Sequence, residues 1–551
     1  MKILLPILVG LFSLTAAFAN AQDDPAEVAI GERLFLETRF AEFFARNSQG
    51  DVNRPLAAGD PTVETTDTPD GPLAGPFAGL SINCRSCHLV DEQLALDSQG
   101  LPVFDEGGIR TYADFARRSP VPEREDGATR TPRNSPALVN ASLARRAGVT
   151  FHFDGEFPTL ATLVRETLTG RNYGWLPSER KQAVAQIVRV VRKDDGSGEL
   201  AHEFGGPYAR VLRGTDERIP EELRLPKHLR IDVVKASDDK ILRAVAKLIA
   251  IYVEQLEFAT DDSGAFTGSP FDLFLLRNAL PRQPKKRETA LAYSRRLSAA
   301  LDDVPSPRFV SDVDGPYGLH DQAFEFGPDE LAGLRIFLRE PEADDPPDAT
   351  GVGNCVACHP APFFTDFLLH NTGVSQVEYD GVHGGGAFAA LEIPTEAERK
   401  QDPEAFLPAT AKHPSGTGRF RAAAVPGQPE LTDLGVWNVL GNKDFKDAQS
   451  RVRKLLAKSL TTKVARKQLL DASIARFKTP GLRDLGHSGP YMHNGEFDTL
   501  DSVVDLYVTT SALQRAGELR NGASQLADIR VASGDVPLLA AFLRSLNEDY
   551  D

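Results

Sequence analysis

Two short stretches hold all four cysteines of this 551-residue chain. They read Cys84-Arg85-Ser86-Cys87-His88 and Cys355-Val356-Ala357-Cys358-His359. A C-x-x-C-H run is the attachment signal for c-type haem, because the two thiols form thioethers with the vinyl groups and the adjacent histidine binds the iron. A redox dithiol or half of a zinc site would explain one C-x-x-C, but two copies that are each followed by histidine favour haem. The pattern predicts two covalently bound haems with His88 and His359 as proximal ligands.

The small number of methionines limits the choice of a second axial ligand for each iron. The chain has two methionines, Met1 and Met492, and the first belongs to the N-terminal apolar segment. A His/Met haem would therefore have to use Met492. The competing candidate is Tyr507, which follows His493 by 14 residues at the end of an expected helix over 500–506. A buried tyrosine whose hydroxyl is bonded to a carbonyl is the structural alternative for Tyr507.

The N-terminus predicts export. Lys2 precedes an apolar run from Ile3 to Phe18, and Ala19-Asn20-Ala21 follows, which fits a signal peptide over residues 1–21 and a periplasmic location. The alternative is an uncleaved N-terminal anchor. No later segment has enough apolar residues for a membrane span, so we do not expect an integral membrane protein. The net charge of −16 argues against nucleic acid as a partner.

The rest of the chain predicts a mostly α fold in two similar halves. We expect helices over 30–35, 160–168, 178–193 and 237–256 in the first half, and over 330–337, 500–506 and 536–546 in the second. The stretch 494–500 nearly repeats 154–160, which indicates an internal duplication into two cytochrome c-like domains. The predicted boundaries are 22–260 for the N-terminal haem domain, 261–275 for a linker and 276–551 for the C-terminal haem domain. An insert over about 375–470, read as loops with some helix, enlarges the second half.

The order of the motifs carries a family resemblance. After the first C-x-x-C-H come Arg133-Asn134-x-Pro136 and Asp154-Gly155, and after the second come Thr479-Pro480-x-x-Arg483 and 490–495, Pro-Tyr-Met-His-Asn-Gly. This order resembles the bacterial di-haem cytochrome c peroxidase and MauG superfamily over nearly the whole chain except the insert. The resemblance implies that the N-terminal haem meets peroxide and that the C-terminal haem relays electrons.

The same resemblance bears on the distal residues. It places a ligand of the C-terminal haem at the position of Tyr507, which favours Tyr507 over Met492 and is typical of MauG-like members. Where resting peroxidases of the family carry a histidine near the N-terminal haem, this chain has Asp126, so we expect that haem to be open on its distal side. His152, beside Asp154-Gly155, is either a distal ligand or acid/base group or an ordinary packed histidine.

The proton-handling residue is less clear from the sequence. Peroxide cleavage needs a group that moves a proton between the two oxygens. The family places a glutamate where this chain has Tyr173, and Glu166 is the nearest downstream carboxylate, so Glu166 is our candidate, with an exposed helix residue as the alternative. The family tryptophan between the haems is replaced by Phe153, which leaves a through-space route or Trp175 for electrons.

Calcium between the halves is also implied by the resemblance. The matching positions are Asn134, Ser488 and Pro490. An amide oxygen and a backbone carbonyl suit Ca²⁺, which accepts neutral oxygens and several waters. The alternative is that Asn134 merely holds a turn.

Together these patterns predict a di-haem peroxidase-like enzyme that reduces hydrogen peroxide. The expected reductant is a small soluble electron donor, a cytochrome c or a cupredoxin. The alternatives are MauG-like oxidation of residues on a protein substrate and a non-catalytic electron-transfer cytochrome.

Overall fold

The computed structural model describes residues 24–54, 65–68, 71–74, 82–84, 87–88, 118–119, 121–143, 148, 150–318, 320, 322–346, 349–460, 463–465 and 468–549. The predicted signal peptide, 1–21, lies outside these ranges. Within them the protein is mostly helical, and its strands form two small antiparallel sheets, β1 (Thr65–Thr68) with β2 (Gly71–Ala74) and β3 (Leu369–His370) with β4 (Phe477–Lys478). None of the described helices is long and apolar enough to cross a membrane.

The N-terminal half is built from seven labelled helices. They are α1 (Ala26–Phe35), α2 (Glu42–Asn47), α3 (Leu160–Leu168), α4 (Arg180–Lys193), α5 (Glu199–Glu203), α6 (Tyr208–Val211) and α7 (Asp238–Gln255). The Ser237 side chain accepts a hydrogen bond from the Lys240 backbone and so caps α7, the helix that the sequence predicted over 237–256. One apolar core from Val28 to Val253 unites these helices.

The C-terminal half carries a second apolar core, from Phe271 to Leu546. Its helices are α8 (Pro270–Arg277), α9 (Ala290–Asp302), α10 (Pro328–Leu338), α17 (Leu500–Ala516) and α18 (Val536–Arg544). The predicted linker 261–275 is a loop only in its first part. Ser269 caps α8, and Phe271 and Phe274 on that helix are buried, so the later part of the predicted linker belongs to the core.

Glycine permits the same close helix crossing in both halves. In α1, a Cβ at Gly31 would lie 2.3 Å from the Leu248 carbonyl oxygen of α7. In α10, a Cβ at Gly333 would lie 1.9 Å from the Leu538 carbonyl oxygen of α18. Both pairs of helices therefore approach at a distance that a larger residue would prevent.

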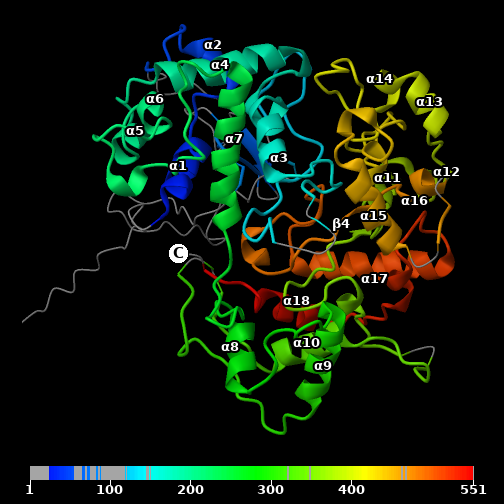
Figure 1. The fold of residues 1–551 in the computed structure, drawn as a ribbon. Coiled ribbons are helices and arrows are strands. Elements are labelled where there is room, and N and C mark those ends of the chain that lie inside the picture. The colour runs from blue at the N-terminus through cyan, green and yellow to red at the C-terminus, as the bar shows by residue number, and fades with distance from the viewer. Residues whose placement is uncertain are drawn as a thin grey trace, which may run out of the picture.

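The insert is a folded unit with its own core. It contains α11 (Val374–His383), α12 (Ala387–Ala390), α13 (Glu396–Gln401), α14 (Pro403–Phe406), α15 (Gln449–Ser459) and α16 (Leu469–Ala472). Its buried residues, between Leu369 and Ala475, surround Trp437, which is fully buried. In Figure 1 the insert stands beside the α3 side of the N-terminal half and above α17.

Two turns with related sequences have the same backbone form. In the first, Phe151 pairs with Phe157, and His152 and Gly155 have φ of 64° and 74°. In the second, Tyr491 pairs with Phe497, and Met492 and Gly495 have φ of 71° and 64°. Each turn leads into a helix capped by threonine, α3 by Thr159 and α17 by Thr499. His152 and Met492 thus occupy equivalent places.

A buried carboxyl, Glu548, makes stability depend on pH. Its side chain is buried, and its Oε1 accepts a hydrogen bond from the Ala259 backbone at 3.1 Å. Burial raises the pKa of Glu548 to about 8, an effect that Arg483 opposes and Asp272 reinforces. Because this pKa lies above the unfolded value, the contribution is full below about pH 4.5 and is lost as pH rises through 8.

Replacing Glu548 with glutamine should remove this pH dependence. Glutamine keeps the size and the acceptor for Ala259 but has no charge to bury. The variant should be more stable than the parent above pH 8, by no more than about 5 kcal/mol. Urea unfolding at several pH values measures the difference, with exposed Glu222→Gln as the control. An equal pH slope in parent and variant would contradict the assignment.

Candidate functional site

The second C-x-x-C-H forms a tight turn that prepares its histidine for metal binding. The His359 backbone N–H donates to the Cys355 carbonyl at 2.8 Å, and the His359 side chain is buried. Its Nδ1 lies 2.8 Å from the Phe364 carbonyl oxygen. Because a carbonyl can only accept, Nδ1 carries the proton and Nε2 is left with a lone pair for a ligand.

A cavity of about 350 Å³ opens beside this turn. Cys355, Cys358 and His359 line it together with Tyr507 of α17. Burial raises the pKa of the Tyr507 phenol, and the two cysteines add to the effect. Met492 lines the same cavity. These side chains fit a c-type haem, which needs two thiols, a histidine nitrogen and a further oxygen or sulfur ligand. Tyr507 has the oxygen and Met492 has the sulfur.

The first C-x-x-C-H has the same turn. His88 N–H donates to the Cys84 carbonyl at 3.0 Å, and His88 Nδ1 lies 3.0 Å from the Pro136 carbonyl oxygen. His88 is thus also left with a free Nε2. Burial lowers the pKa of His88 to about 4; the Pro136 bond opposes this, and His152 lowers it further. The residues between His88 and Arg118 lie outside the described ranges.

His152 is held in a fixed orientation in the cavity described above. It lines the same cavity as His359 and Tyr507, together with Pro136, whose carbonyl holds His88. The described residues of the first motif, Cys84, Cys87 and His88, do not line this cavity, but His152 is near enough to His88 to lower its pKa. Its Nδ1 lies 2.5 Å from Oε1 of Glu156, and its ring meets Phe157 edge-on at 4.9 Å. The Glu156 carboxylate is buried, so it accepts the Nδ1 proton and Nε2 of His152 remains available.

The structure places Glu166 elsewhere. Its carboxylate pairs with Arg180 at 2.5 Å and with Arg165 at 3.0 Å on the partly exposed face of α3. It is not among the cavity-lining residues. The residue at the family glutamate position, Tyr173, is buried instead, and its hydroxyl lies 3.1 Å from Cys84 Sγ.

Asp126, which replaces the family histidine, pairs with Arg171 in a partly exposed loop. The Asp126 carboxylate lies 2.7 Å from Arg171 Nε. A carboxylate held this way does not provide the nitrogen ligand that a histidine would at this position.

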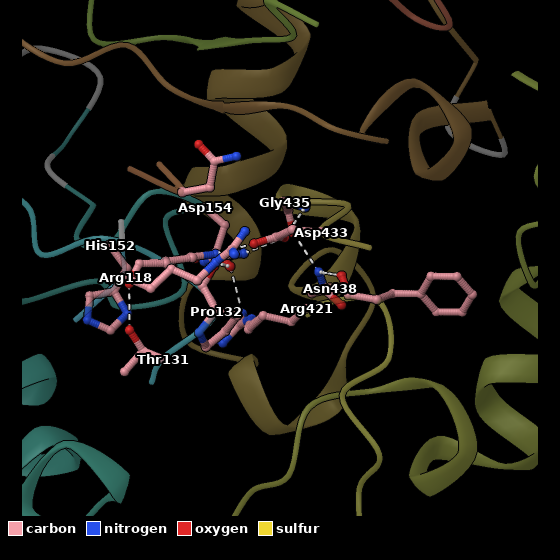
Figure 2. Close-up of polar contacts among 12 residues, drawn as sticks. Arg118, Thr131, Pro132, His152, Asp154, Arg421, Asp433, Gly435 and Asn438 are labelled. Atoms are coloured by element: carbon pink, nitrogen blue, oxygen red, sulfur yellow. Dashed lines mark hydrogen bonds and ion pairs between the residues drawn. The ribbon is translucent and has the colours of Figure 1, made fainter. Parts of the chain in front are cut away.

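A buried ion cluster lies where the insert meets the N-terminal half (Figure 2). Arg133 donates to Asp154 at 2.8 Å and to both oxygens of Asp433 at 2.6 and 2.9 Å. Arg421 donates to Asp154 at 2.6 Å and to Glu156 at 2.8 Å. The insert therefore contributes one cation and one carboxylate to the same cluster that holds His152.

The three residues expected to hold calcium are only partly brought together. Asn134 Nδ2 donates to the Pro490 carbonyl across the two halves. Ser488 lines the cavity with them, but its hydroxyl donates to the Asp484 carbonyl at 3.1 Å. The Asn134 side chain thus meets the Pro490 carbonyl with its nitrogen, while its oxygen accepts from the Ser135 backbone and Ser488 is bonded elsewhere.

Aromatic rings from both halves meet in the cavity. Phe477 stacks on His493 at 3.7 Å, and Phe153 meets His493 at 6.5 Å. All three line the cavity. Trp175 does not; it is buried in the N-terminal core, where its Nε1 donates to the Phe40 carbonyl.

Sequence reasoning missed Glu156, Arg421, Asp433 and His493. The first and last carried a signal, because Gly-Glu-Phe occurs in both related turns and His493 occupies the place of Phe153 in the second. Arg421 and Asp433 carried none, since they lie in the insert and meet partners some 300 residues earlier.

A mostly helical chain with two such turns has the features of a cytochrome c-type protein. Sequence comparison is more specific. Over 203 residues the chain is 30% identical to cytochrome-c peroxidase IdrP2 of Denitromonas iodatirespirans, covering 36% of this chain and 37% of that protein. It is 36% identical over 74 residues to the methylamine utilization protein MauG of Methylorubrum extorquens, covering 13% of this chain and 19% of that one. These relatives support the di-haem peroxidase and MauG superfamily for this chain.

The remaining comparisons add context. The aligned part spans little more than a third of the length of IdrP2. No protein-family model matches the chain. Among solved structures, the diheme peroxidase BthA from Burkholderia thailandensis aligns with 95% of this chain and 86% of its own, at 16% identity and a TM-score of 0.40.

Proposed function

We propose that the protein is an exported, periplasmic di-haem c-type peroxidase. The two halves would be duplicated cytochrome c-like domains, which the equivalent turns and helix crossings support. The observation that carries the proposal is the asymmetry of the two sites. Tyr507 and Met492 line the cavity together with His359, whereas the group near His88 is His152, which Glu156 holds and which lowers the pKa of His88.

The residues that would hold the haems follow from the two turns. Cys84, Cys87 and His88 would bind the first, and Cys355, Cys358 and His359 the second, with Tyr507 as the second axial ligand and Met492 as the alternative. When bound, haem supplies an iron that accepts peroxide at the first site and relays electrons at the second.

His152 is the residue that we assign to proton handling. Reduction of hydrogen peroxide to two waters consumes two electrons and two protons. Because Nδ1 donates to Glu156, Nε2 of His152 is free to take the proton of the bound peroxide oxygen and return it to the leaving oxygen. The electrons would come from a small soluble donor through the second half.

Oxidation of a protein substrate is the second candidate function. Tyr507 supports it, since a tyrosine ligand is what the resemblance associates with MauG-like members, and one sequence relative carries that name. An electron-transfer cytochrome is the third, and it would need a strong second ligand at both haems.

One experiment separates these functions. The ferric holoprotein is mixed with stoichiometric hydrogen peroxide, and turnover is then followed with reduced cytochrome c. A peroxidase shows a spectral response and oxidises the donor. Response without turnover favours a protein substrate, and no response together with an absence of high-spin haem would leave only electron transfer.

Tyr507→Phe tests the ligand of the second haem. Phenylalanine keeps the ring but lacks the oxygen, so the ferric electron paramagnetic resonance spectrum should lose its low-spin His/Tyr signature. Tyr491→Phe is the matched control, because Tyr491 lines the same cavity while its hydroxyl donates to the Leu485 carbonyl. An unchanged spectrum in Tyr507→Phe would contradict this assignment and would make Met492 the candidate for the second axial ligand.

Calcium between Asn134 and Pro490 is a further part of this proposal. The Pro490 carbonyl is a neutral oxygen ligand that suits Ca²⁺ with added waters, and the Asn134 amide, whose nitrogen donates to this carbonyl, would turn to offer its oxygen. A bound Ca²⁺ ion would connect the two halves and would take no part in the reaction.

A further inference from the structure

We propose that the insert completes the first haem site, because its Arg421 holds Glu156 in the position that orients His152. This inference rests on the proposed function, since it gives His152 the proton-handling role. It assigns a task to residues 375–470. Arg421 and Glu156 are positioning residues here, and His152 is the group that meets the substrate.

Arg421 reaches the N-terminal half through two bonds. Its Nη1 donates to Glu156 Oε2 at 2.8 Å and its Nη2 to Asp154 Oδ2 at 2.6 Å. Glu156 uses its other oxygen, Oε1, for His152 Nδ1. One guanidinium thus fixes a carboxylate that has a single remaining oxygen for the imidazole, and this arrangement leaves the ring little freedom to turn.

The insert holds Arg421 rigidly. Arg421 forms an isolated bridge with Asp433, and the flanking Ala422 and Leu434 N–H groups donate across the same pair of segments. Next to it, Phe420 packs against Trp437 at 5.1 Å, and the buried Asn438 side chain donates to the Phe420 carbonyl at 2.6 Å. The core of the insert therefore determines where the guanidinium lies (Figure 2).

The ion cluster contains one more carboxylate than guanidinium groups. Two guanidiniums, from Arg133 and Arg421, face three buried carboxylates, Asp154, Glu156 and Asp433. Burial alone would raise the pKa of Glu156, but Arg421 and His152 hold it well below its ordinary range. Glu156 therefore stays ionised and can accept the hydrogen bond from His152 Nδ1.

A purely structural role for the insert is the competing explanation. Arg451 donates to the Pro158 carbonyl, and Glu378 pairs with Arg118 at 2.7 Å, so other contacts also attach the insert to the N-terminal half. A test must therefore measure how well His152 acts as a base, not how stably the insert is attached to the N-terminal half.

Cyanide binding provides such a reading without turnover. Hydrogen cyanide must lose its proton to bind ferric haem, so its association rate reports a base beside an open haem. The variants are Arg421→Gln, Arg421→Lys and Glu156→Gln. Arg419→Gln is the matched control, since Arg419 lies in the same segment and donates to the Ala405 carbonyl within the insert.

Arg421→Gln and Glu156→Gln should slow cyanide association by about 10–100-fold and flatten its pH profile, while the control behaves as the parent. Arg421→Lys should recover part of the rate, because an ammonium keeps the charge but cannot bridge two carboxylates as a fork. If Arg421→Gln does not fold, Glu156→Gln and Arg421→Lys decide the question.

Three outcomes are distinct. Slow binding in the variants alone supports the inference, even when peroxide turnover is absent. Parent-like rates in all variants overturn it and leave the peroxidase proposal intact. A parent protein that binds no cyanide has no open haem, which overturns the peroxidase proposal and this inference with it.

Discussion

Replacing Cys84 and Cys87 with serine is expected to remove one of two haems and to abolish the response to peroxide. Serine cannot form the thioether, so the first haem would lose its covalent attachment and would depend on His88 alone. Haem content, measured by mass spectrometry and the pyridine haemochrome assay, should fall from two per chain to one. The low-spin signature that we assign to His359 and Tyr507 should remain.

The opposite pair is the matched control for this experiment. Cys355 and Cys358 changed to serine should also leave one haem per chain, but here the low-spin signature disappears. The first site should still respond to stoichiometric peroxide, because the His152–Glu156 pair lies in the other half of the chain. Turnover with reduced donor should be lost. A peroxide response that survives only in the Cys84/Cys87 variant would exchange the two assigned roles.

The haem motifs and the main helices could be predicted because their signals are local. The C-x-x-C-H turns close through bonds between His88 and Cys84 and between His359 and Cys355, within five residues. The helices predicted over 160–168 and 178–193 are α3 and α4, whose apolar faces repeat at helical spacing. The structure extends the predicted 500–506 helix to Ala516, so Tyr507 lies within α17 rather than at its end.

The contents of the first site could not be predicted in the same way. Spacing alone gave Glu166 as the nearest carboxylate, but position along α3 does not say which face a side chain occupies, and Arg180 draws it outward. Glu156 was hidden in a turn, and its role depends on Arg421, which lies 265 residues later. Contacts over such separations depend on how the insert folds, which periodicity does not describe.

Arg133→Met is expected to cause the largest loss of stability among single substitutions in the cluster. Arg133 is buried, and it makes bidentate contact with Asp433 of the insert while it also donates to Asp154. Methionine fills similar space but leaves Asp433 buried without its cation. Breaking one partner of a buried pair destabilises a protein by about 3–5 kcal/mol. Urea unfolding measures the loss.

The pH dependence of that loss identifies its cause. Burial alone would raise the pKa of Asp433, but Arg133 keeps it below the ordinary value. Stability from such a carboxylate is present above the unfolded pKa, near 4, and is lost as pH falls. Without Arg133, burial raises the pKa of Asp433, and the carboxyl group is buried at low free-energy cost only when it is protonated. The loss of stability in Arg133→Met should therefore be largest near pH 7 and should shrink toward pH 4.

A surface pair supplies the comparison that separates this effect from the loss of any arginine. Arg243 on α7 pairs with Asp239 at 2.7 Å, and both side chains are more than half exposed. Because water screens such pairs, Arg243→Met should change stability by less than about 1 kcal/mol at every pH. If Arg133→Met loses no more than Arg243→Met, or if its deficit does not vary with pH, the ion cluster is not what joins the insert to the N-terminal half. If the deficit follows the predicted pH profile, the cluster that orients His152 is also the main electrostatic contact between these two parts of the chain.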